Sequence, residues 1–189
     1  MADEEEKPGA IALSIAAAMQ HLGNGEMAAL RRLDDPARAP AFWRLAARHD
    51  ALARRADRWG PVVRALALLT PKGQPGERGD IRDDERKLGA VLCDGGQRDW
   101  PSGGDPRPML SELRLAQLLA ARGEQRPVLL MRAVRMLAAR RDPGKCIDVP
   151  DLAWAFLNDD PHGIARPYYI RLDRAERAAA TDEETATDA

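Results

Sequence analysis

The spacing of apolar residues along this chain is the feature that most restricts its fold. The segment VLLMRAVRMLAARR repeats them every three or four positions, at Leu130, Ala133, Val134 and Leu137. This spacing places them on one face of a helix. Alanine and leucine are abundant, aromatic residues make up only 4%, and long β-branched runs are absent. The sequence therefore predicts an all-α protein with no convincing strand.

Stretches rich in glycine and proline separate the predicted helices. The two longest, residues 71–86 and 94–108, are expected to be loops, the first of them mobile. A chain of 189 residues suits one domain or two small ones, and 94–108 is the best boundary between them. The predicted organisation is two small helical bundles with acidic disordered ends: an N-terminus (1–8), an N-terminal helical domain (9–98), a C-terminal helical domain (107–178) and a tail (179–189).

Several classes of function lack their usual signals in this sequence. The longest apolar run, residues 11–19, is too short to cross a bilayer, and the acidic N-terminus is unlike a secretory signal. Cys93 and Cys146 stand far apart without CxxC spacing, which favours a reduced, cytoplasmic protein. No phosphate-cradling loop, dinucleotide-binding motif or zinc-ligand pair is present, so no cofactor and no metal are expected.

Three histidines remain as candidates for acid–base chemistry. His49 falls on the apolar face of a predicted helix, which favours a hydrogen-bonded core residue over a catalytic base. His162 follows Asp159-Asp160-Pro161, a pattern typical of a capped helix start. The chain is therefore expected not to be an enzyme, while a hydrolase that uses His49 or His162 is the competing hypothesis.

Positive charge is concentrated in two predicted helical blocks, although the formal net charge is −1. Residues 31–64 hold nine arginines against four acids, and residues 107–141 hold eight against two. In the first block, a helix over 41–59, ended by Gly60-Pro61, would align four arginines opposite its apolar face, and a break near His49-Asp50 would change that alignment. Such concentration of positive charge is typical of proteins that bind a polyanion.

The candidate polyanion contacts are arginines in these basic blocks, most of them on helix faces that lack acids. They are Arg31, Arg32, Arg44, Arg48, Arg55, Arg58, Arg114, Arg122, Arg132 and Arg135. Each taken singly is also compatible with a solvated surface, and Arg171 and Arg174 could pair with neighbouring Asp173. Neither a helix-turn-helix nor an aromatic sheet platform is evident, which favours contacts to a phosphate backbone over base reading.

A series of segments in a fixed order carries a family resemblance. They are GNGEMAALRRL, APAFWRL, KLGAVLCDGG, LSELRLAQLLAARGEQRPVLLMRAVRMLA and IDVPDLAWAFL, followed by Tyr168-Tyr169. Over about residues 10–175 the chain resembles the CasB family, the small subunit of the type I-E CRISPR surveillance complex Cascade. The chain departs from the family where two adjacent arginines are usual, because it has Leu113-Arg114 there.

The resemblance implies a non-catalytic, all-helical subunit for antiviral defence, present in two copies beside other Cascade subunits. Its implied partners are the CRISPR RNA and the target and non-target DNA strands. No membrane is expected as a partner. It would stabilise the RNA–DNA hybrid and the displaced strand, with matched arginines facing phosphates: Arg31, Arg32, Arg114, Arg132 and Arg135. The stripe of Arg44, Arg48, Arg55 and Arg58 depends on periodicity alone. The alternative is a helical protein–protein interaction scaffold whose arginines pair with acidic partner surfaces.

Overall fold

The computed structural model describes residues 7–101, 105–140 and 147–187. Within these ranges it is helical, and its only extended pairing is an isolated parallel bridge between Arg82 and Ile147. The elements are α1 (Pro8–His21), α2 (Asn24–Arg31), the 3-10 helix η1 (Pro36–Arg38), α3 (Pro40–Ala46), α4 (Asp50–Arg54), α5 (Ala56–Leu69), α6 (Leu88–Asp94), α7 (Glu112–Ala120), α8 (Gln125–Arg140), α9 (Val149–Leu157) and α10 (His162–Thr187). The predicted all-α fold is confirmed.

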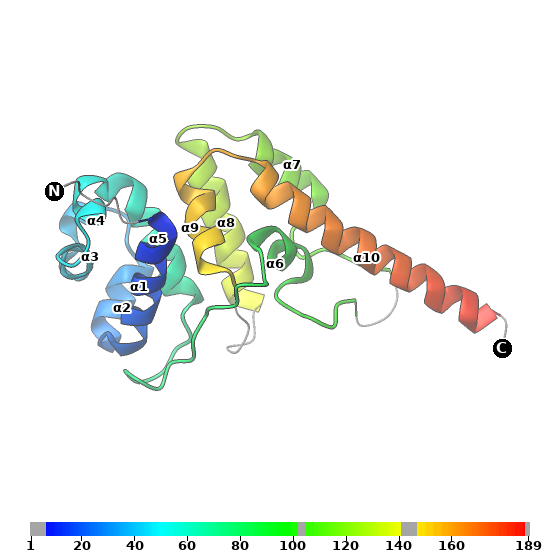
Figure 1. Cartoon of the computed structure of the whole chain (residues 1–189), viewed down its shortest axis with the longest axis horizontal. Helices are drawn as coiled ribbons and strands as arrows, with labels where there is room; N and C mark the ends of the chain where they lie inside the picture. The colour runs from blue at the N-terminus through cyan, green and yellow to red at the C-terminus, as the bar shows by residue number, and fades with distance from the viewer. Residues whose placement is uncertain (1–6, 102–104, 141–146, 188–189) are drawn as a thin grey trace.

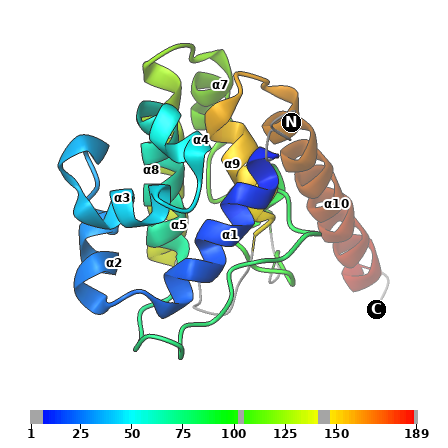
Figure 2. The same ribbon diagram turned by 60° about the vertical axis from the view of Figure 1, so that its left-hand side comes forward.

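The helices are arranged from one end of the molecule to the other, with α8 and α9 in the middle. Helices α1 to α5 lie on one side of this pair and α6, α7 and α10 on the other (Figures 1 and 2). Helix α1 packs against α9, α5 packs against both α8 and α9, and α10 packs against α6. The C-terminal end of α10 projects beyond the body of the molecule (Figure 1).

The contact between α1 and α9 shows how the sequence encodes the packing. Helix α1 buries a face at helical spacing that comprises Ile11, Ala12, Ile15, Ala16 and Met19. At its start, Gly9 leaves room for α9, since a Cβ there would lie 3.1 Å from the Cβ of Pro150. Helix α9 begins after Asp148, whose side chain accepts a hydrogen bond from the Asp151 amide at 2.9 Å. The sequence pattern predicts one helix over residues 149–157, and α9 has these bounds.

The prediction of a single helix over residues 41–59 is wrong, because this segment forms α3, α4 and the start of α5. The chain turns after Ala46, and His49 adopts an extended conformation before α4. A tertiary contact accompanies the break: the Nε2 atom of His49 lies 3.0 Å from the hydroxyl of Ser14 in α1. A second break falls at Arg55, between α4 and α5.

The expected helix end at Gly60-Pro61 is also wrong, since Pro61 lies inside α5. The missing amide of Pro61 removes only the bond to the carbonyl of Asp57, in the first turn of the helix. Burial of apolar side chains before and after Pro61 offsets this loss, because Trp59, Val62 and Val63 all lie in the core. Propensity is overridden here by tertiary packing.

The segment expected to be a mobile loop, residues 71–86, forms no helix, but two of its residues are buried. Arg78 is 4% exposed and Ile81 2% exposed. The guanidinium of Arg78 donates to the carbonyls of Met19, Gln20 and Leu22, where α1 ends. These bonds fasten the middle of the segment to the helical body.

The division into domains 9–98 and 107–178 stays a prediction. Buried residues from both ranges belong to one hydrophobic cluster, and α6 from the first range packs against α10 from the second. The tail expected to be disordered from residue 179 is helical through Thr187, within α10. Most of the acidic N-terminus, residues 1–6, lies outside the described residues. Among the helices that are described, none has both the length and the hydrophobicity to cross a membrane.

Candidate nucleic-acid interface

Five of the ten candidate arginines are exposed and have no partner among the residues that the structure describes. In the part of the chain that the structure describes, their guanidinium groups make neither a hydrogen bond nor an ion pair. These five are Arg48, Arg55, Arg58, Arg132 and Arg135. Because no described residue neutralises their charge, these five guanidinium groups are available to a ligand.

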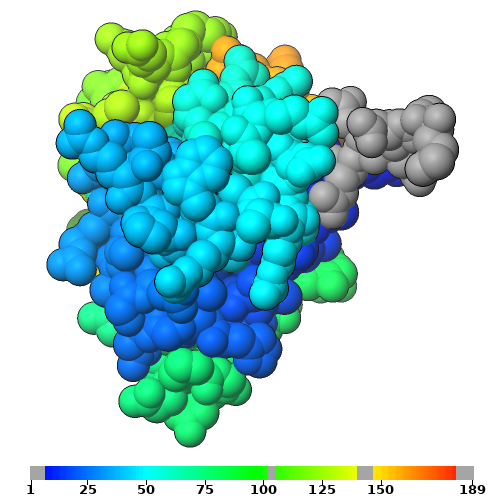
Figure 3. Space-filling view, turned by 90° about the vertical axis from the view of Figure 1, so that its left-hand side faces the viewer, coloured from blue at the N-terminus to red at the C-terminus, as the bar shows by residue number. Residues whose placement is uncertain are grey.

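Three of these arginines surround the short helices α3 and α4. Arg48 lies in the turn after α3, Arg55 between α4 and α5, and Arg58 in the first turn of α5. Helices α2, α3 and α4 lie together on the face seen in Figure 3. The expected stripe along one helix is therefore replaced by a group of arginines spread over three short segments.

Arg44, the fourth member of that stripe, is neutralised by an acid from another helix. Its guanidinium forms an ion pair with Glu26 of α2 at 2.5 Å. The pKa of the Glu26 carboxyl is lowered, first by the hydrogen bond from Arg44 and then by the bond from the Gly23 amide. The sequence pattern shows only that the predicted helix itself offers no acid to Arg44. It does not show an acid from another helix, so it missed Glu26.

Arg31 has a structural set of contacts that the sequence did not indicate. Its guanidinium donates to the carbonyls of Ala67 at 3.0 Å, Thr70 at 3.1 Å and Pro71 at 3.5 Å. These carbonyls lie where α5 ends, and the last carbonyls of a helix have no intrahelical partner. Burial, followed by the nearby charge of Arg78, lowers the pKa of Arg31. Arg31 therefore stabilises a helix end, and we do not assign it to the interface.

Arg31 and its neighbour Arg32 give a matched pair of variants. Arg31→Ala is expected to lower the free energy of unfolding by about 1–2 kcal/mol, because carbonyls in a partly buried site lose their donor. Arg32→Ala is expected to change stability little, since, among the described residues, the exposed guanidinium of Arg32 donates only to the carbonyl of Ala28 in α2. Urea unfolding followed by circular dichroism measures both; equal losses would contradict the structural assignment of Arg31.

Arg122 also bonds to backbone, at the end of α7, but it stays exposed. Its guanidinium donates to the carbonyls of Leu119 at 2.7 Å and Ala121 at 2.9 Å. A positive charge at this position complements the negative end of the helix dipole. Arg32 and Arg122 thus combine a local structural role with an exposed charge.

Two of the candidate arginines, one on α7 and one on α8, open onto a shared groove. Arg114 of α7 and Arg132 of α8 line a groove of about 290 Å³ together with Gln117. Nη1 of Arg114 lies 3.7 Å from the sulfur of Met136. The core face predicted for α8 is confirmed, and Arg132 and Arg135 project away from it as expected.

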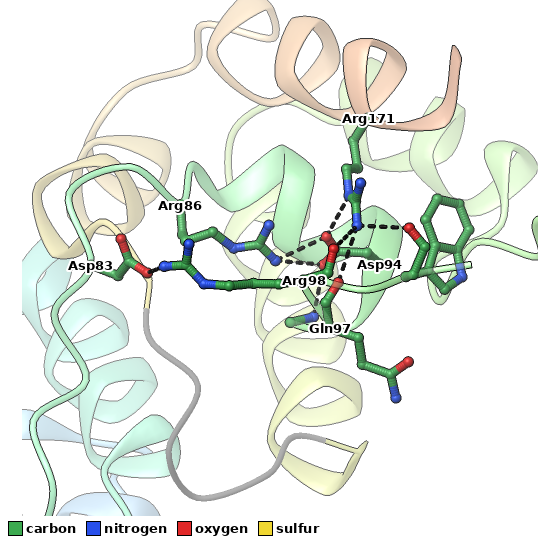
Figure 4. Close-up of polar contacts among 8 residues, drawn as sticks. Asp83, Arg86, Asp94, Gln97, Arg98 and Arg171 are labelled. Carbon is green, nitrogen blue, oxygen red and sulfur yellow. Dashed lines mark hydrogen bonds and ion pairs between the residues drawn. The ribbon is translucent and has the colours of Figure 1, made fainter. Parts of the chain in front are cut away.

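A second class of arginine is neutralised inside the protein, around Asp94. Figure 4 shows the guanidinium groups of Arg86 and Arg171 reaching its carboxylate from different elements. Arg86 donates to it at 2.8 and 2.9 Å and Arg171 at 2.7 Å, and the Asp94 side chain is fully buried. The sequence indicates that Arg171 could pair with neighbouring Asp173, but its guanidinium instead joins α10 to the end of α6 through Asp94.

The same cluster fixes the chain that follows α6. Gly95 ends the helix with a left-handed conformation (φ 66°), and the Gly96 amide donates to Asp94 at 2.9 Å. Arg171 also donates to the carbonyls of Gln97, Arg98 and Trp100. The sequence places Asp94 only in a turn-rich stretch, since no local pattern identifies Arg86 and Arg171 as its partners.

The described residues bring together no convincing catalytic group. His49 contacts Ser14, and His162 is the first residue of α10, with its amide bonded to Asp160 as expected for a capped start. Burial raises the pKa of the Cys93 thiol to about 12, so this thiol is a poor nucleophile near neutral pH. Among the described residues, no group of histidine, cysteine or acidic side chains could hold a metal ion.

Comparison with known proteins identifies the family. Residues 26–179 match the family described as CRISPR-associated protein Cse2. This range contains all ten candidate arginines as well as the groove between α7 and α8. No curated protein and no solved structure matches the chain. Because the matched range covers well over half of the 189 residues and agrees with the order of motifs in the sequence, the chain belongs to the Cse2 (CasB) family of type I-E Cascade subunits.

Proposed function

We propose that this Cascade subunit binds nucleic acid through its exposed arginines and thereby stabilises the R-loop. It would contact the phosphates of the guide RNA–target DNA hybrid and of the displaced DNA strand. Replacing a DNA duplex by an RNA–DNA hybrid is nearly balanced in free energy, so modest contacts to the backbone can shift the equilibrium. Sequence is read by the guide in such a complex, so the subunit needs only charge and shape.

The observation that carries this proposal is the contrast between two classes of arginine. Arg86 and Arg171 are half-buried and pair with the buried Asp94, whereas Arg82 pairs with Asp84 at the surface. Arg48, Arg55, Arg58, Arg132 and Arg135 are exposed without a carboxylate among the described residues. Guanidinium groups bind phosphates in a planar, bidentate manner, and each phosphate that they neutralise releases counterions.

A protein–protein scaffold is the second candidate, and exposed apolar side chains favour it. Leu113 is 71% exposed, Val128 52% and Trp154 48%. Large exposed apolar residues are frequent at protein interfaces. In this alternative the free arginines would pair with acidic groups of neighbouring subunits, and their loss would weaken assembly without affecting nucleic-acid binding by a complex once assembled.

The double variant Arg132→Ala/Arg135→Ala tests the proposal within reconstituted Cascade. Both side chains are exposed on α8, so the variant should fold and assemble as the wild type does. We expect faster dissociation of the R-loop, because two phosphate contacts are lost. Arg82→Ala is the matched control, since that arginine is already paired with Asp84. Unchanged R-loop lifetime in an assembled double variant, or weakened assembly alone, would favour the scaffold.

A further inference from the structure

The groove between α7 and α8 combines an apolar floor with a cationic rim. Leu110, Leu118 and Ala133 lie beneath it, each no more than 4% exposed. Leu129 and Met136, which are half-buried, complete the apolar lining. Arg114, Gln117 and Arg132 are exposed along its sides. None of the described residues that line the groove carries a carboxylate, so it suits an anion that also carries an apolar surface.

A nucleotide has both of these properties. Its base presents a flat, weakly polar face that can lie on aliphatic side chains, and the sulfur of Met136 adds a favourable contact with an aromatic ring. Its phosphate can accept hydrogen bonds from the Arg114 and Arg132 guanidinium groups, while the Gln117 amide can pair with a base edge. At about 290 Å³ the groove is at the small end of ligand sites, which suits one base.

We infer that this groove holds one unpaired nucleotide of single-stranded nucleic acid, with the base on the apolar floor and the phosphate between Arg114 and Arg132. The inference rests on the proposed function and makes it more specific. Because a base stacked within a duplex cannot enter the groove, the nucleotide bound there must belong to an unpaired strand. Unpaired strands are bound by proteins through this combination of a basic groove and base stacking. The displaced strand is therefore the partner that the groove fits, in preference to the hybrid.

An acidic peptide is the competing occupant, and the position of the groove argues against it. Arg135 lies on α8 three residues beyond Arg132, and exposed Arg122 lies at the end of α7. Cations therefore continue beyond the groove, along the helices that form it. A nucleic-acid strand carries a phosphate at every nucleotide, so it can contact each arginine of this series in turn. An acidic side chain in the groove would leave the arginines outside the groove unused.

Binding of the full chain to two 30-nucleotide single strands tests the inference. One strand is thymidine throughout, and the other has the same phosphates but abasic sugars. We expect the wild type to bind the thymidine strand about fivefold more tightly, the lower end of what stacking of one base supplies. Leu129→Gln, on the groove, should remove this preference while leaving binding of the abasic strand unchanged. Val128→Gln, on the same helix but outside the groove, should keep it.

The outcomes separate this inference from the proposed function. Equal binding of both strands by the wild type, or a preference that Leu129→Gln leaves intact, would overturn the nucleotide site but leave backbone binding in place. Absence of binding to either strand, both by the free chain and in reconstituted Cascade, would overturn the proposed function itself. If Leu129→Gln fails to fold, photocrosslinking of the wild-type protein to a strand that contains 5-iodouracil tests the site instead. Crosslinks to residues of α7 and α8 are expected, and crosslinks confined to residues outside these helices would overturn the site.

Discussion

Asp94→Ala is expected to lower the free energy of unfolding by about 3–5 kcal/mol, the usual result of removing one partner from a buried charge cluster. The Asp94 carboxylate is fully buried and accepts hydrogen bonds from Arg86, Arg171 and the Gly96 amide. In the variant, two largely buried guanidinium groups lose the charge that compensates them. The contact between α6 and α10 and the path of the chain after Gly95 are expected to loosen together.

Urea unfolding of Asp94→Ala and two companion variants measures this effect. Asp94→Asn keeps the shape but removes the charge, so its stability should fall between that of Asp94→Ala and that of the wild type. Asp84→Ala removes an exposed partner of Arg82 and should leave stability nearly unchanged, as is usual for surface ion pairs. A loss for Asp94→Ala no larger than that for Asp84→Ala would show that the cluster does not hold the two helices together.

Gly89→Ala should be the second strongly destabilising change, with a loss of about 3 kcal/mol, near the upper end for overpacking. Helices α6 and α10 approach closely at this glycine. A Cβ on Gly89 would lie 2.0 Å from the carbonyl oxygen of Ile164 and 3.0 Å from the amide nitrogen of Tyr168. These are backbone atoms of α10, which cannot move aside without shifting the helix.

Gly163→Ala is the matched control for this substitution. Gly163 also lies in a helix, near the start of α10, and a Cβ there would meet nothing within 4 Å. Alanine has the higher helix propensity, so the control should be as stable as the wild type or slightly more stable. Thermal unfolding followed by circular dichroism compares the two. A Gly89→Ala protein that unfolds at the wild-type temperature would contradict the close packing of α6 on α10.

The sequence predicted helices best where an apolar face and its end signals agree. Helix α9 has a capping aspartate before it and an apolar face within it, and its bounds match the expected ones. The segment 41–59 has the same periodicity but is broken into shorter helices. The difference arises from contacts with distant residues, such as that between His49 and Ser14, which no local pattern contains.

The same limit applies to the candidate arginines. Periodicity indicates that a guanidinium lies off the core face of its helix, and this was confirmed for Arg132 and Arg135. It does not indicate whether another segment brings a carbonyl or a carboxylate to that guanidinium. Arg31 meets the end of α5, and Arg44 meets Glu26 of α2, so both have structural partners that only the fold reveals.

Buried arginines were missed for a related reason. Arg78 and Arg126 are 4% and 2% exposed, although both lie near breaks in helical structure where arginine is ordinarily at the surface. Arg78 satisfies carbonyls at the end of α1, and Arg126 donates to the carbonyl of Asp160 just before α10. A signal for such roles could be sought in arginines that follow or precede helix ends, since unsatisfied carbonyls at those ends need donors.

The dependence of nucleic-acid affinity on salt tests the central claim most directly. Single-stranded and duplex binding should be titrated at several salt concentrations with the wild type, Arg132→Ala/Arg135→Ala and Arg82→Ala. If the unpaired arginines contact phosphates, the slope of log affinity against log salt should become shallower for the double variant by about 0.7 per lost contact on single strands, or about 0.9 on duplex. Arg82→Ala should keep the wild-type slope. The same slope for the double variant as for the wild type would show that Arg132 and Arg135 do not bind the phosphate backbone.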